Sequence, residues 1–171
     1  MSATPIVTLR ARTQDDLDLV FELAKDLDTW DERTAVPPRP MTRDEFDARQ
    51  ASESSADIAA FIVEADGIAV GTATLFDFDY LARNAEAGIS LVATARGRGI
   101  GTIAITALVE FGFVRRNLHK IHLQAIASNV AAIRAYEKAG FVIEGRQREQ
   151  AWVRGGYQDI VRMGILRSDL A

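Results

Sequence analysis

The stretch RGRGIGT, residues 96–102, places two arginines and three glycines directly before a strongly apolar run. The glycines at 97, 99 and 101 lack the side chains that would hold a phosphate away from the backbone N–H groups. A helix that begins here leaves its first N–H groups without a helical partner, and its dipole favours negative charge. The segment therefore predicts a phosphate site with Arg96 and Arg98 at its rim, although a solvated surface turn is the alternative that these residues alone leave open.

Two familiar nucleotide motifs do not fit this segment. A dinucleotide fingerprint requires G-x-G-x-x-G, whereas the glycines here alternate as G-R-G-I-G, and the next strand ends without the acid expected for a ribose. A P-loop requires a lysine at the helix start, and the loop contains none. The pattern that remains is R-x-x-G-x-G, formed by Arg96, Gly99 and Gly101.

A second pattern, N-x-x-A-x-x-x-Y followed by E-K-x-G-F, begins at Asn129. Its spacing places Asn129, Ala132 and Tyr136 near one face of a helix. Each residue also has a structural explanation: Asn129 is a suitable helix cap, and Tyr136 could be a core aromatic whose hydroxyl finds a neighbour. The two patterns together, in this order, are harder to explain by chance.

Both patterns resemble those of the GCN5-related N-acetyltransferases, the GNAT superfamily. The stretch from Arg83 to about Leu166 closely resembles bacterial spermidine/spermine acetyltransferases and ribosomal-protein N-terminal acetyltransferases, whereas the N-terminal half matches loosely. The resemblance implies acetyl-CoA as cosubstrate, with no metal, its pyrophosphate in the glycine loop and its pantetheine along the helix after Asn129. The cofactor-binding residues implied in this way are Ile89, Ser90, Leu91, Arg96, Gly97, Arg98, Gly99, Ile100, Gly101, Thr102, Asn129, Ala132, Tyr136 and Lys138.

The resemblance also implies catalytic roles for Tyr136 and Glu86. Tyr136 would be the general acid toward the CoA thiolate, and Glu86 would take a proton from the acceptor amine or only orient it; an exposed strand carboxylate is the alternative for Glu86. An alkylamine with a pKa near 10.4 is neutral in about one molecule in a thousand at pH 7, so a base matters. Because the chain has no cysteine, a cysteinyl acetyl-enzyme is excluded, and we expect direct transfer to the amine.

The acceptor predicted from the resemblance is a small-molecule or peptide amine, first a polyamine such as spermidine or another small cationic amine. Asp31, Glu32, Glu86 and the segment FDFDY offer carboxylates for a cation. The acidic cluster that polyamine enzymes carry after their first helix is replaced here by Ala35, Val36, Pro37 and Pro38, which leaves polyamine specificity and a polyamine allosteric site open. The alternatives are a protein N-terminus, an antibiotic amine, and a CoA-binding sensor without catalysis.

The composition narrows the class of protein. A chain of 171 residues with 48% hydrophobic residues, no cysteine and no apolar run of membrane-spanning length predicts one domain, residues 1–171, in the cytoplasm, without a signal peptide or membrane contact. The net charge of −4 argues against a nucleic-acid partner. His119 and His122, three residues apart on a predicted strand, point to opposite faces and make a metal pair improbable. Relatives of this kind are often oligomers, so we expect a homo-oligomer.

The elements that position these residues follow from periodicity and turn residues. The predicted order is β-α-α-β-β-β-α-β-α-β-β, an α/β (α+β) GNAT fold with one mixed, mostly antiparallel sheet and helices on both faces. Capping boxes at Thr13–Asp16 and Thr42–Glu45 predict the first two helices, with a proline loop over Thr34–Pro40 between them. Asp66–Gly67 predicts a tight hairpin. The strand FVIEG and the pair REQAWVR and YQDIVRMGIL, joined through Gly155–Gly156, close the chain.

Overall fold

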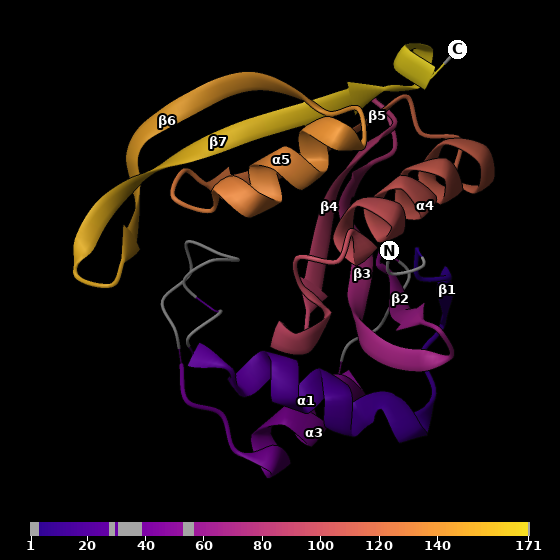
Figure 1. Cartoon of the computed structure of the whole chain (residues 1–171), viewed down its shortest axis with the longest axis vertical. Coiled ribbons are helices and arrows are strands. Elements are labelled where there is room, and N and C mark those ends of the chain that lie inside the picture. Colours follow the sequence, from indigo (N-terminus) through magenta and orange to yellow (C-terminus); the bar gives the residue numbers. More distant parts are fainter. Residues whose placement is uncertain (1–3, 28–29, 31–38, 53–56, 171) are drawn as a thin grey trace.

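The computed structural model describes residues 4–27, 30, 39–52 and 57–170. In this part of the chain, seven strands form one sheet in the order β1-β2-β3-β4-β5-β7-β6, and every neighbouring pair is antiparallel except β4 and β5 (Figure 1). The predicted element order and mixed sheet are confirmed. The strands are β1 Val7–Ala11, β2 Ala59–Ala65, β3 Ile68–Asp79, β4 Asn84–Leu91, β5 Lys120–Ile126, β6 Val142–Val153 and β7 Gly156–Leu166; the main helices are α1 Leu17–Lys25, α3 Arg43–Ser52, α4 Ile100–Arg115 and α5 Val130–Lys138.

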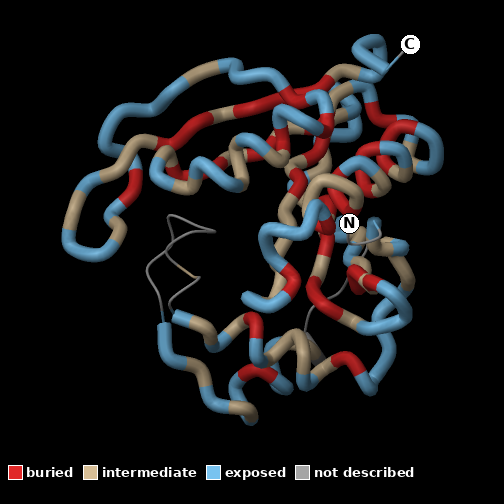
Figure 2. The backbone as a smooth tube through the Cα atoms, in the orientation of Figure 1, coloured by how far each residue is buried: buried red, intermediate tan, exposed pale blue. Residues whose placement is uncertain are grey.

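The two faces of the sheet differ in chemistry. On one, which we call the core face, Leu75 of β3, Ala87 of β4 and Leu123 of β5 pack with Leu108 of α4 and Tyr136 of α5 in the main hydrophobic core. Side chains alternate across a strand, so the intervening residues lie on the other face. Figure 2 shows the buried residues concentrated in the central strands and facing helices, whereas most of β6 is exposed.

The second face, which we call the polar face, carries Thr72 and Thr74 of β3, Glu86 of β4 and His122 of β5. Helices α1 and α3 lie over part of it, because the cavity described below is lined by residues of both helices together with Thr72 and Thr74. The sheet therefore has helices on both faces, as predicted.

Two turns show how sequence fixes the hairpins. Asp66 and Gly67 have φ of 52° and 81°, the two positive values that a tight hairpin turn requires, so this predicted turn is confirmed. The final turn is Arg154–Gly155, with φ of 47° and 82°, and not Gly155–Gly156 as predicted, because Gly156 already pairs in β7. The predicted strands FVIEG and REQAWVR form one strand, β6, whose register shifts twice along β7.

The N-terminal helices begin where their capping residues predict. Thr13 and Asp16 form a capping box that opens a 3-10 turn leading into α1, which ends at Lys25, before the predicted Leu27. Thr42 and Glu45 exchange side-chain and backbone hydrogen bonds of 3.1 and 3.2 Å at the start of α3. The predicted proline loop lies mostly outside the described residues. Across the described segments, no helix is long and apolar enough to cross a membrane.

Candidate active site

The glycine segment joins the end of β4 to the start of α4. Gly97 and Gly99 have φ of 70° and 80°, a left-handed backbone conformation that favours glycine. A Cβ on either residue would have no atom within 4 Å, so both face open space. The first bond into α4 runs from the Ile103 N–H to the Gly99 carbonyl at 3.2 Å, which leaves the preceding N–H groups at the helix start for an anion. Gly101 lies within α4, where a Cβ would make only an ordinary contact with Leu91 at 3.6 Å, so neither packing nor backbone conformation requires glycine there.

Arg96 has a contact that the sequence did not indicate. Its Nε and Nη2 donate hydrogen bonds to the Leu91 carbonyl at 3.0 and 2.9 Å, which ties the glycine loop to the end of β4. The guanidinium thus holds the loop in place as well as lying at its rim. Arg98 is exposed beside it, as expected of a rim residue, and Ile100 is fully buried under the loop.

The strands β4 and β5 part beside this loop. They pair only from Asn84 to Glu86 on β4, whereas β4 continues along β3 to Leu91 and β5 continues along β7 to Ile126. The predicted contacts Ile89, Ser90 and Leu91 all lie on the section of β4 beyond that pairing. The parted edge therefore presents strand backbone close to the glycine loop.

Helix α5 supplies the second set of predicted residues. Asn129 caps it, since its side-chain oxygen accepts a hydrogen bond from the Ala132 N–H at 3.1 Å, so the cap explanation for Asn129 is correct. Tyr136 is buried on the core face, its ring 6.1 Å from that of Phe141, and burial raises the pKa of its hydroxyl to about 12. Lys138 is exposed in the last turn of α5.

Glu86 lies on the polar face at the last residue where β4 still pairs with β5. Its side chain is 12% exposed, and His122 Nε2 lies 3.9 Å from its Oε2. Burial raises the pKa of the Glu86 carboxyl, although the charge of Arg162 and a hydrogen bond from Gln124 oppose that shift. The exposed-carboxylate alternative is wrong, because Glu86 is a partly buried acid within a polar cluster.

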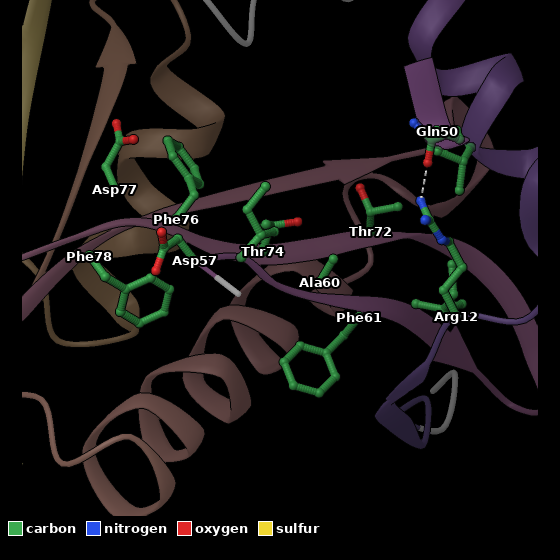
Figure 3. Close-up of a pocket in the computed structure, with 13 residues that line it drawn as sticks. Arg12, Gln50, Asp57, Ala60, Phe61, Thr72, Thr74, Phe76, Asp77 and Phe78 are labelled. Atoms are coloured by element: carbon green, nitrogen blue, oxygen red, sulfur yellow. Dashed lines mark hydrogen bonds between the residues drawn. The ribbon is translucent and has the colours of Figure 1, made fainter. Parts of the chain in front are cut away.

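A cavity of about 680 Å³ opens on the polar face (Figure 3), and Glu86 is not itself part of its lining. Phe76, which lies opposite Glu86 in the β3–β4 register, is part of its lining. Figure 3 shows Arg12 and Gln50, joined by a 2.5 Å hydrogen bond, at one end and Asp57 and Asp77 toward the other. The cavity therefore offers a cation at one end and two carboxylates at the other.

Sequence reasoning found only part of this cavity. Asp77 belongs to the predicted FDFDY segment and lines it, whereas Asp79 of the same segment accepts the N–H groups of Leu81 and Ala82 in a turn. Arg12 and Gln50 were missed, because only the packing of α3 against the sheet brings them together. The predicted carboxylates Asp31 and Glu32, and the segment Ala35–Pro38, lie outside the described residues.

The two histidines lie in different surroundings. His119 is exposed and lies just before β5, whereas His122 is within it and faces Glu86. Over the ranges that the structure describes, no group of three or more His, Cys, Asp or Glu side chains could hold a metal ion. That the reaction needs no metal stays a prediction.

Comparisons with known proteins agree with this geometry. The family model described as Acetyltransferase (GNAT) domain matches residues 7–142. The chain is 37% identical over 109 residues to spermidine N(1)-acetyltransferase of Vibrio cholerae, and the alignment covers 63% of each chain. It is 29% identical over 104 residues to Bacillus subtilis YdaF, named as a putative ribosomal N-acetyltransferase, and that alignment covers 61% of this chain and 57% of YdaF. These alignments thus span less than two thirds of the length of either relative. The crystal structure of spermidine N-acetyltransferase from V. cholerae in complex with CoA and spermine superposes with a TM-score of 0.89 at 30% identity, covering 96% of this chain and 98% of that one.

Proposed function

Because the chain belongs to the GNAT acetyltransferase family, we propose that it transfers an acetyl group from acetyl-CoA directly to a primary amine. One observation carries the proposal: the parted edge of β4 begins beside Glu86 on the polar face, while Tyr136 is buried on the core face. A candidate base for the amine and a candidate acid for the departing thiolate thus lie on opposite faces of the sheet. The open glycine loop lies where the chain leaves the same strand.

The residues present fit acetyl-CoA at this edge. The backbone N–H groups from Gly97 to Thr102 would hold the pyrophosphate, and each hydrogen bond to a charged group contributes about 1.5–3 kcal/mol. Arg98 would add charge at the rim. The backbone of Ile89–Leu91 would pair with the pantetheine, with Asn129, Ala132 and Lys138 beside it. When bound, acetyl-CoA supplies the thioester that the amine attacks.

The chemistry of the chain's own residues follows from their surroundings. Glu86 removes a proton from the ammonium form of the acceptor, and burial favours this role because it raises the affinity of the carboxylate for a proton. Tyr136, whose raised pKa of about 12 keeps its hydroxyl protonated, donates a proton toward the departing sulfur. Orienting the amine without taking its proton remains the lesser role for Glu86.

The cavity on the polar face is our proposed acceptor site. Its carboxylates Asp57 and Asp77 suit a cationic amine, and relatives named as spermidine acetyltransferases make a polyamine the first acceptor to test. The position of Arg12 favours a second candidate, a peptide N-terminus, because a peptide can bring a carboxylate to the far end of the cavity. An antibiotic amine is a third acceptor for the same assay.

The test is CoA thiol release from acetyl-CoA in the presence of spermidine, short peptides or aminoglycosides. Amine-dependent release, with mass spectrometry locating the acetyl group, would support the proposal. Tight acetyl-CoA binding without release by any amine would instead indicate a CoA-binding sensor. A homo-oligomer, proposed from the resemblance alone, is checked separately by gel filtration with light scattering.

A further inference from the structure

His122 is a titratable side chain beside Glu86 that the proposed reaction does not yet use. If Glu86 takes the amine proton, it must lose that proton before the next turnover. Glu86 is only 12% exposed, whereas the His122 side chain is 30% exposed. The imidazole of His122 therefore has better access to solvent than the Glu86 carboxylate beside it.

The register fixes this neighbour in place. Glu86 and His122 occupy matching positions of the parallel β4–β5 pair, and His122 Nε2 lies 3.9 Å from Glu86 Oε2. A direct hydrogen bond spans about 2.7–3.2 Å, so one bridging water or a small side-chain rotation would connect the two groups. Both residues lie within regular strands of the central sheet, which holds the pair in register.

The charged groups that act on His122 come from β3, β5, β6 and β7. Asp77 of β3, Lys120 of β5, Glu144 of β6 and Arg162 of β7 all act on His122. Lys120 and Glu144 form an ion pair of 2.7 Å, so their charges partly offset each other. Burial, followed by the charges of Lys120 and Arg162, lowers the pKa of His122, which leaves its imidazole neutral and able to accept a proton at pH 7.

We propose that His122 relays the acceptor's proton from Glu86 to solvent. The inference rests on the proposed function, because it requires Glu86 to act as the base. The proton leaves the ammonium nitrogen for a Glu86 carboxylate oxygen, passes to His122 Nε2, and is then released to water. Only N–H and O–H bonds form and break, so no further reactant is required. His122 acts through Glu86 and makes no contact with the acceptor in this scheme.

The test compares His122→Gln with His119→Gln as a matched control, because His119 is exposed and lies just before β5, where its backbone bonds to Arg83 and Arg167. We expect His122→Gln to lower kcat by roughly 10- to 100-fold, at or below the lower end of direct acid–base contributions because Glu86 itself remains, with the KM for acetyl-CoA unchanged. The acid limb of its pH–rate profile should change shape, and added imidazole should restore turnover. His119→Gln should match the wild type in each measurement.

Three results would overturn the relay. Wild-type kcat and pH profile in His122→Gln would do so, as would a loss of kcat that imidazole does not restore. Additive losses in the pair Glu86→Gln and His122→Gln would show that the two residues act independently. His122→Asn provides a second variant should the glutamine protein fold poorly. If the wild type itself shows no amine-dependent release, the proposed function fails and the relay with it; a working wild type with an unaffected His122→Gln removes the relay alone.

Discussion

Glu86 and Tyr136 lie on opposite faces of one sheet, Glu86 on the polar face at the end of the β4–β5 pairing and Tyr136 of α5 in the core that α4 also covers. Their surroundings push both pKa values upward, because burial disfavours a carboxylate and a phenolate alike. A base with raised proton affinity and an acid that stays protonated are thereby placed on the two sides of the parted strands. An amine approaching from the cavity and a thioester lying along the strand edge would meet between them.

Tyr136→Phe removes the proposed acid while keeping the ring that packs against Phe141. We expect kcat to fall by about 10²- to 10⁴-fold. The affinity for CoA, measured by calorimetry, should remain close to the wild-type value, because the hydroxyl acts only on the departing sulfur. Wild-type turnover in this variant would contradict the assignment.

Glu86→Gln should separate activity from stability. Turnover with the acceptor amine should fall by roughly 10² or more, since the amide cannot take a proton. The pKa of Glu86 is raised in the folded state, so its contribution to stability is present below the unfolded pKa and is lost as pH rises through the folded value. At pH 7 the ionised carboxylate therefore opposes folding, and Glu86→Gln should melt at a higher temperature than the wild type. A lower Tm at pH 7 would argue against the buried-acid description.

Gly101→Val tests the glycine loop. A Cβ at Gly101 meets only Leu91, at 3.6 Å, so the fold should tolerate the change while the side chain intrudes on the phosphate site. Loss of even one hydrogen bond to a charged group, about 1.5–3 kcal/mol, would raise the KM for acetyl-CoA roughly tenfold or more. Gly145→Val is the control, because a Cβ there meets no atom within 4 Å and the residue lies on β6. An equal KM in both variants would refute the role of the loop.

Arg96→Lys tests whether the loop must be tied to β4. Lysine keeps the charge but cannot reproduce the paired bonds from Nε and Nη2 to the Leu91 carbonyl. We expect acetyl-CoA to bind less tightly by about 1–3 kcal/mol, measured by calorimetry. Arg98→Lys keeps a charge at the same rim and should bind nearly as well as the wild type. Equal losses in both variants would show that the bonds to Leu91 are not what acetyl-CoA binding requires.

Asp16→Asn tests the N-terminal region without touching the site. Asp16 is buried and accepts two hydrogen bonds from Arg10, at 2.8 and 2.9 Å, and one from the Thr13 N–H. These contacts hold the pKa of the Asp16 carboxyl well below its usual range. Its contribution to stability is present above the unfolded pKa and is lost as pH falls through the folded value. Urea unfolding at pH 7 should show a loss of about 1–3 kcal/mol that shrinks at low pH. Asp18→Asn, whose side chain is 85% exposed in its pair with Arg43, should cost under about 1 kcal/mol.

The local features could be predicted because their causes are local. Periodicity set the order of helices and strands, capping boxes placed the starts of the helices at Thr13 and Thr42, and positive φ at Gly97 and Gly99 accounts for the glycines of the loop. The final hairpin was displaced by one residue, because Arg154 as well as Gly155 takes a positive φ there. A positive φ at a residue with a side chain, such as Arg154, cannot be predicted from the positions of the glycines.

By itself the sequence determined the element order, the glycine loop before α4 and the residues of α5 that follow Asn129. Only the tertiary structure determined which side chains from distant parts of the chain lie next to one another. Strand register alone brings His122 to Glu86, and the packing of α3 alone brings Gln50 to Arg12 at one end of the cavity. These contacts join residues far apart in the chain, and periodicity specifies which face a side chain occupies but not which strand lies next to it.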